Sequence, residues 1–200
     1  ELDARSTAPA LYEQLDDEDL ELAEQIEPAL CRWQHAPMHE RLKNRLSQPV
    51  SLPRWHVLAI RGLADLRDQS VVPGLTELAT DTAVHASIRL EAAAALGSLV
   101  DSGIKPPNVV ENKSARGILN RLVAARMLER HRGAAVETLL AELARDTEPA
   151  VQTIALEHLY HNDPRLIVPF VAETIASPAA SVRRWGWVTE MHCHDATTSG

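Results

Sequence analysis

Aromatic residues are scarce in this chain of 200 residues, which has four Trp, two Tyr and one Phe. Glycine is also sparse, and its eight residues are few for the many tight turns of an all-β protein. Leu and Ala fill the apolar positions instead, and both are strong helix formers. The apolar fraction of 45% and the charged fraction of 24% are ordinary for a globular protein. The composition therefore predicts an all-α fold.

The chain also lacks an excess of positive charge and any long apolar run. Its 28 acidic and 20 basic residues give a formal net charge of −8. Because an acidic chain repels phosphate backbones at long range, nucleic-acid binding is disfavoured, although a local basic patch remains an alternative. No apolar run approaches the roughly 18 residues that cross a bilayer. We expect a soluble chain without a membrane span, and its compartment, cytoplasmic or exported, stays open.

Cysteine is limited to Cys31 and Cys193, near opposite ends of the chain and outside any CxxC pattern. This gives no support for a zinc ribbon or for covalent haem attachment. We expect ordinary buried thiols, since a disulfide would require the two ends of the chain to meet. The chain begins at Glu1 without Met, so we expect a processed product or a piece of a larger protein.

Internal repetition is the most informative feature of the sequence. The segment RWHVLAIRGL at 54–63 recurs as SIRLEAAAAL at 87–96, and further copies begin at 150 and 181. The copy expected between them is ILNRLVAARM at 118–127. Apolar residues recur at helical spacing in these segments. The sequence therefore predicts five helices with a period near 32 residues.

A second helix follows the first in most of these units. The segments 71–79 and 166–176 lie three periods apart and align Pro73 with Pro169, and 133–145 supplies the second helix of the middle unit. Proline costs little in the first turn of a helix, because the amide that it lacks would be unpaired there. The pattern predicts an array of helix–turn–helix hairpins.

A recurring turn and helix start carries a resemblance to a known family. The pattern is Asp, a few polar residues, Val or Ile, Arg and then an Ala/Leu-rich helix, and it is carried by Asp81 with Ile88 and Arg89, Asp146 with Val151, and Val182 with Arg183. This resembles the short bacterial HEAT repeats, also called PBS-lyase-type repeats. Gln152 departs from it where Arg is usual, and Pro178 replaces the turn Asp.

The resemblance covers about residues 54–190 and implies an all-α, right-handed α–α superhelix, a solenoid of antiparallel hairpins like HEAT and armadillo proteins. It says little of activity, since the family contains scaffolds, adaptors and a few enzymes. We expect residues 1–53 to form a divergent helical cap or half-repeats, 54–194 to form the repeats, and 195–200 to be a frayed tail. Within the cap, we expect Pro28 to break or restart a helix.

An irregular loop at 101–114 (DSGIKPPNVVENKS) replaces one expected second helix. Its Pro106–Pro107 pair prevents a continuous helix. Long loops in compact proteins are often functional, although this one could be a tolerated insertion. The residues of this loop that we consider candidates for an interaction are Lys105, Asn108, Asn112 and Lys113.

A second candidate surface is formed by Arg183, Arg184 and Trp185, close to Trp187. Arg beside Trp could stack on a base or hold an anion, whereas a Trp at the end of an array is more often part of the core. The alternative function is therefore a nucleic-acid-acting protein of the HEAT-like DNA glycosylase type. The acidic balance of the chain weighs against it.

Histidine offers one metal-like cluster, His192–His194 with Cys193 between the imidazoles. A transition metal accepts such ligands, but adjacent residues rarely converge without a distant third ligand, so we predict no metal site and keep a metal or redox accessory as a further alternative. His158 and His161 stand near a predicted helix end, where we expect capping or exposure.

Catalytic motifs are missing from the sequence. There is no GxSxG, no HExxH and no Gly-rich phosphate loop after a strand. We therefore predict a non-catalytic scaffold with no cofactor and no catalytic residue. Its partner is expected to be another protein or an adjoining domain of the same chain.

Overall fold

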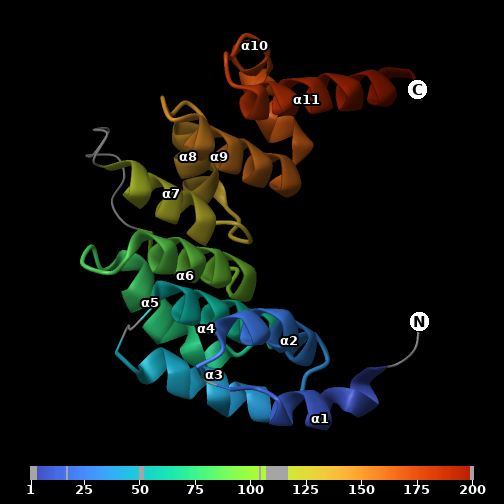
Figure 1. The fold of residues 1–200 in the computed structure, drawn as a ribbon. Coiled ribbons are helices and arrows are strands. Elements are labelled where there is room, and N and C mark those ends of the chain that lie inside the picture. The colour runs from blue at the N-terminus through green and yellow to red at the C-terminus, as the bar shows by residue number, and fades with distance from the viewer. Residues whose placement is uncertain (1–3, 17, 50–51, 104, 107–116, 199–200) are drawn as a thin grey trace. The chain divides into compact units, whose positions relative to one another are not determined.

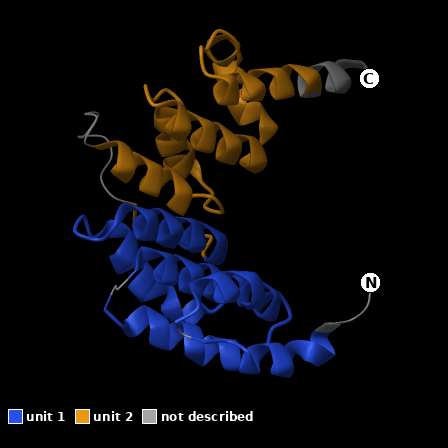
Figure 2. Ribbon diagram, viewed as in Figure 1, with its two compact units in different colours: residues 1–99 blue, residues 100–200 orange. Residues whose placement is uncertain are grey.

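The structure, a computed structural model, describes residues 4–16, 18–49, 52–103, 105–106 and 117–198, without the side chains of 4 and 192–198. Every regular element in these ranges is a helix, which confirms the predicted all-α fold (Figure 1). No helix in them is both long and apolar enough to span a membrane. The chain divides into two compact units, residues 1–99 and 100–200 (Figure 2).

Unit 1 is built from helical pairs. Its elements are η1 (Ala4–Thr7), α1 (Ala8–Glu13), α2 (Leu20–Arg32), α3 (Pro37–Ser47), α4 (Pro53–Asp65), η2 (Gln69–Val71), α5 (Val72–Thr80) and α6 (Ala86–Leu99). Helix α4 packs against both α2 and α6, while α3 packs against α4 and α5 packs against α6 (Figure 1). Successive pairs are therefore joined through their first helices.

Unit 2 repeats this arrangement. Its described elements are α7 (Ile118–Met127), α8 (Ala134–Leu143), α9 (Pro149–Asn162), η4 (Pro164–Phe170), α10 (Val171–Ile175) and α11 (Ala180–Thr198). Helix α9 packs against α7, α8 and α11, and α10 packs against α11. The helix predicted at 118–127 has the same bounds in the structure.

One hydrogen bond recurs at the same place in the repeat. Arg89 donates through Nε to the carbonyl oxygen of Ala79, 3.1 Å away, and Gln152 donates through Nε2 to the carbonyl oxygen of Ala144, also at 3.1 Å. Each acceptor lies at the end of the preceding helix, where carbonyl groups have no partner within the helix. Gln152, the departure from the usual Arg, therefore makes the same bond as Arg89.

Two further units have the equivalent contact. Arg183 donates through Nη1 to the carbonyl oxygen of Ser177 at 2.8 Å. The ring of His56 hydrogen-bonds the backbone of Gln48, the residue that ends α3. Residues 56, 89, 152 and 183 all stand third in their copies of the repeated segment. The position is kept by a side-chain donor rather than by one residue type.

The Asp of the turn also has a structural role. The Oδ1 atom of Asp81 accepts a hydrogen bond from the amide of Ala83 at 2.8 Å, and Oδ1 of Asp146 accepts from the amide of Glu148 at 2.9 Å. These are the side-chain turns that Asp forms with the amide two residues ahead. They fix the chain between the end of one hairpin and the start of the next.

Small residues let the helices of a unit approach closely. Ala59 is fully buried in α4, and Ala155 is fully buried in α9. A Cβ atom on Gly62 of α4 would lie 2.5 Å from Leu42 Cδ1 and 3.0 Å from Cys31 Sγ. Glycine at this position therefore permits the packing of α4 against α2 and α3.

The expected break at Pro28 was wrong. Helix α2 runs without interruption from Leu20 to Arg32 with Pro28 inside it. Proline removes only its own amide, and the helix continues beyond it, as the 3.0 Å bond from the amide of Trp33 to the carbonyl of Ala29 shows.

The second helix predicted at 166–176 is only partly α-helical. Residues 164–170 form the 3₁₀ helix η4, and α10 covers residues 171–175. Pro164 and Pro169 supply no amide donors, which removes two of the bonds that an α-helix here would make. At the other end of the unit, α11 includes residues 195–198, for which the sequence favours a frayed tail.

Candidate functional site

The loop candidates give no assembled site. Lys105 is exposed, and the structure places it in no helix. Asn108, Asn112 and Lys113 lie outside the described residues. The role predicted for the 101–114 loop therefore stays a prediction.

The three candidates on α11 do not form one exposed surface. Trp185 is 9% exposed and packs in the core of unit 2, with its ring centroid 5.4 Å from that of Tyr160. The guanidinium of Arg183 is bound to backbone carbonyls before the helix. Arg184 is exposed, and its Cζ lies 6.0 Å from the Trp185 ring. The exposed aromatic residue of this segment is Trp187, at 55%.

The histidines at the end of α9 differ from the expectation. His161 is exposed, but His158 is buried, and burial together with the charges of Arg126 and His161 lowers its pKa to about 4. His158 is therefore neutral at pH 7 and supplies no charge to cap the helix. The prediction of capping or exposure was wrong for this residue, because its side chain turns into the core.

The possible metal cluster at 192–194 cannot be placed, since these side chains lie outside the described part of the chain. Elsewhere among the described residues, no group of three or more His, Cys, Asp or Glu side chains could hold a metal ion. Cys31 is buried, as expected, and burial beside Glu27 raises the pKa of its thiol to about 12.

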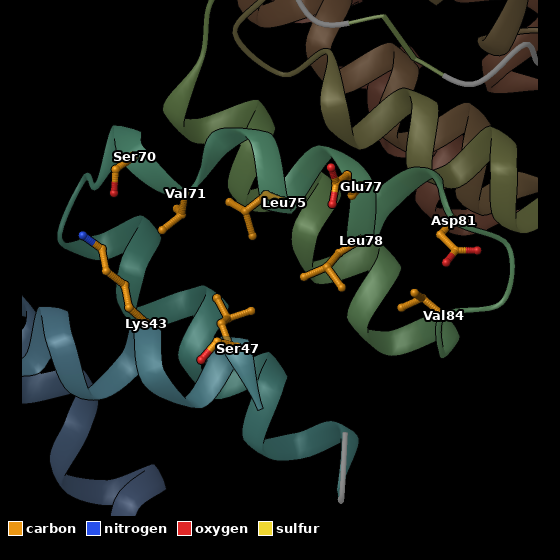
Figure 3. A pocket seen from close by; sticks show the side chains of 11 residues that line it. Lys43, Ser47, Ser70, Val71, Leu75, Glu77, Leu78, Asp81 and Val84 are labelled. Carbon is orange, nitrogen blue, oxygen red and sulfur yellow. The ribbon is translucent and has the colours of Figure 1, made fainter. Parts of the chain in front are cut away.

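A groove of about 460 Å³ lies between α3 and α5 in unit 1 (Figure 3). We call it the α3–α5 groove. Its walls come from α3, from η2 and α5, and from the turn that leads to α6. The residues that line it are Lys43, Leu46, Ser47, Ser70, Val71, Gly74, Leu75, Glu77, Leu78, Asp81 and Val84.

The α3–α5 groove is mainly apolar along its length. Leu75 is buried at its base, while Leu46, Val71, Leu78 and Val84 are only half-buried. Val71, Leu75 and Leu78 are spaced by four and three residues, so they lie along one face of α5. Apolar side chains gathered in a groove at the surface indicate a place where another molecule binds.

Gly74 leaves open space in the wall of this groove. A Cβ atom built on Gly74 would have no heavy atom within 4 Å. This contrasts with Gly62, where the same addition meets buried side chains. Gly74 is therefore not required for packing within the unit, and another molecule can approach the backbone of α5 there.

The basic group at one end of the groove is already paired. Nζ of Lys43 lies 2.9 Å from Oδ2 of Asp68, and Nδ1 of His39 lies 3.3 Å from the same oxygen. Partial burial would raise the pKa of Asp68, but hydrogen bonds from Lys43, Ser70 and His39 outweigh it and hold that pKa well below its usual range. Asp68 thus stays ionised and compensates the charge of Lys43.

The other end of the groove is acidic, with Glu77 and Asp81 at its rim (Figure 3). The charge of Asp81 faces the buried Arg89, whose pKa it raises against the lowering effect of burial. Glu77 is exposed and forms no ion pair with any side chain that the structure describes. The uncompensated charge of the groove is therefore negative.

The whole of unit 1 has the same sign. Residues 1–99 contain 16 of the 28 acidic residues of the chain but only nine of the 20 basic ones. Nearly all of the net negative charge therefore belongs to the unit that contains the groove. An approaching cationic group is attracted to this unit at long range.

A second hollow, of about 500 Å³, lies along α2 and α4 but differs in its charges. Arg54 pairs with Glu24 at 2.7 Å, and Arg61 pairs with Glu91 of α6 at 2.8 Å. These exposed pairs connect neighbouring first helices and compensate one another. The α3–α5 groove is the stronger candidate site, because it combines apolar surface with a free carboxylate.

Sequence reasoning missed the α3–α5 groove. The spacing of Val71, Leu75 and Leu78 was assigned to a helix that buries its apolar face, and nothing in a single sequence says how much of that face a neighbour covers. Gly74 early in a predicted helix was the available signal, because glycine is unfavourable there unless something requires it.

Comparisons with protein-family models, with curated proteins and with solved structures find no match to this chain. What can be said of its function therefore comes from the helices, the recurring contacts and the groove themselves.

Proposed function

We propose that this chain is a non-catalytic scaffold of HEAT-like repeats, and that it binds a protein partner or an adjoining domain of the same chain. The period near 32 residues supports the repeat architecture, as does the side-chain bond to the end of the preceding helix at residues 56, 89, 152 and 183. In this proposal the hairpins form a solenoid, in which each repeat covers the apolar side of its neighbour.

The packing inside each unit is compatible with such stacking. Helix α4 lies against α2 and α6, and α9 lies against α7 and α11, so first helices meet first helices. A bundle around one central core would instead bring the second helices into equally extensive contact.

The observation that carries a binding role is the α3–α5 groove. It presents half-buried apolar residues next to Glu77, a carboxylate with no ion pair among the described side chains. Cores of protein interfaces are apolar with polar rims, which is the distribution found here. A partner that covers this groove would bury apolar surface now in water, at about 25 cal/mol per Å² before the costs of association.

The polar groups beside the groove favour binding over catalysis. Ser70 donates through Oγ to Oδ1 of Asp68 at 2.6 Å, and His39 contacts Oδ2 of the same carboxylate. An activated serine needs the imidazole next to its hydroxyl and the carboxylate behind the imidazole. Here the carboxylate stands between the two, so His39 cannot take the proton of Ser70.

A matched pair of variants tests the proposal. Gly74→Trp fills the α3–α5 groove from a position with open space, and Ala135→Trp places the same side chain at an exposed position of α8 in unit 2. Each purified protein is used to capture partners from an extract of the source cells. The partner is then purified and its Kd measured by calorimetry. We expect the wild type and Ala135→Trp to bind equally and Gly74→Trp to bind at least tenfold more weakly.

Two results would overturn the proposal. One is a wild-type chain that retains no protein partner. The other is selective retention of DNA, with a steep dependence on salt, which would support the nucleic-acid alternative instead. Metal analysis of the purified chain tests the metal or redox alternative in the same preparation.

A further inference from the structure

We infer that the α3–α5 groove takes an amphipathic helix of the partner, with a Lys or Arg of that helix placed against Glu77. The inference rests on the proposed function and specifies the chemistry of the partner. It is argued from the shape, the backbone and the charge of the groove.

The groove runs along α5, from Val71 near Lys43 at one end to Asp81 and Val84 at the other (Figure 3). The nine residues of α5 span roughly 13 Å at a rise of 1.5 Å per residue. An occupant of similar length makes between two and three helical turns. Its apolar residues, at spacings of three and four, would lie along the row formed by Val71, Leu75 and Leu78.

The walls of the groove favour a helix over an extended peptide. Both long walls are helices, α3 and α5, whose backbone groups bond within their own helices. They offer no free strand edge to which a peptide could add. An extended occupant would lose water from its amides and carbonyls without replacement, whereas a helix brings its own backbone bonds. The groove can therefore recognise side chains but not an extended backbone.

The charges of the groove favour a basic occupant. Lys43 is compensated by Asp68 and Asp81 faces Arg89, which leaves Glu77 as the free charge of the rim. An acidic helix would meet this carboxylate without compensation and would approach a unit with a negative balance. A Lys or Arg on the occupant would instead pair with Glu77 at the edge of an apolar contact.

Gly74 strengthens the case for a closely packed occupant. It lies between Val71 and Leu78 on α5, with nothing within 4 Å of its missing side chain. A side chain of the occupant can therefore reach the backbone of α5 at this point. Any residue larger than glycine would reduce the depth available to it.

The probe for the test is a displayed library of random peptides of about 16 residues. It is selected on the wild-type chain and depleted on Gly74→Trp. We expect the enriched sequences to have apolar residues at i, i+4 and i+7 and a basic residue beside them, and to gain helicity on binding. Measured by fluorescence anisotropy, Glu77→Lys should weaken such a peptide about tenfold, and a peptide with Glu in place of its basic residue should recover binding to Glu77→Lys.

Three outcomes would overturn the inference: enriched peptides that are acidic, peptides that bind equally well with a central proline, or no enrichment over Gly74→Trp. Circular dichroism must first show that Glu77→Lys and Gly74→Trp fold like the wild type. A natural partner that is lost with Gly74→Trp but binds through an extended or acidic segment would leave the proposed function intact and remove only this inference. Absence of any protein partner would remove both.

Discussion

The guanidinium of Arg45 holds the carboxylate of Glu27 through two hydrogen bonds of 2.8 Å, and both side chains are buried in unit 1. Arg45 also lies 4.3 Å from the centre of the Trp55 ring. Removal of one member of a buried ion pair leaves the other charge without compensation. We expect Arg45→Ala to lower the free energy of unfolding by about 3–5 kcal/mol, measured by urea denaturation.

The exposed pair of Arg54 and Glu24 provides the control. Its two side chains are in contact with water, and Arg54→Ala should cost less than about 1 kcal/mol. Equal losses for Arg45→Ala and Arg54→Ala would contradict the distinction between the buried and the exposed pair.

The bond from Gln152 to the carbonyl of Ala144 predicts which replacements the repeat tolerates. Gln152→Arg should leave the stability within about 0.5 kcal/mol, because Arg89 and Arg183 make the equivalent bond. Gln152→Ala removes the donor and should cost about 1 kcal/mol. Thermal unfolding of the two variants checks this, and equal stability for both would show that the recurring bond contributes nothing.

Glycines of this chain should respond to alanine in opposite ways. A Cβ atom on Gly186 would lie 2.6 Å from Ile175 Cγ1 and 3.1 Å from the backbone nitrogen of Ile175, so Gly186→Ala should cost about 1–3 kcal/mol. Gly74→Ala meets nothing and should stabilise α5 by about 0.5–1 kcal/mol. Both are read from urea denaturation, and a stabilised Gly186→Ala would refute the close packing of α11 on α10.

Unit 2 should lose stability in mild acid because His158 is buried as the neutral form. Its pKa is about 4 in the folded chain against an ordinary value of 6.5, so the unfolded chain binds the proton first as the pH falls. The contribution is complete above pH 6.5, is lost progressively between pH 6.5 and 4, and amounts to about 3 kcal/mol.

The variant that checks this is His158→Gln, which cannot titrate. Its free energy of unfolding should depend less steeply on pH between 4 and 6.5 than that of the wild type. Some slope should remain, because burial also lowers the pKa of His56 and of His131. An unchanged slope would show that His158 is not buried as described.

The helices could be predicted because local spacing decides them. The apolar rhythm of 54–63, 87–96 and 118–127 repeats with a constant period, and each segment is a helix in the structure. Proline was harder to interpret. Pro28 lies inside a continuous helix, whereas Pro164 and Pro169 accompany a 3₁₀ turn, and the difference depends on whether neighbouring turns hold the helix together.

The candidate site could not be predicted, because exposure depends on neighbours that are distant in sequence. Trp185 beside two arginines suggested a binding surface, yet Tyr160 and the rest of the core cover it. Leu78 and Val84 suggested ordinary core residues, yet both remain half-buried on the groove. In each case the periodicity identifies a helix face correctly and leaves open what packs against that face.

The central claim is that a protein partner lies directly against α5 in the α3–α5 groove. Photo-cross-linking from a benzophenone amino acid at position 74, compared with the same group at position 135, tests it most directly. The account predicts a cross-link to the partner from position 74 and none from position 135. A partner that binds with full affinity but cross-links only from position 135, or from neither position, would contradict it.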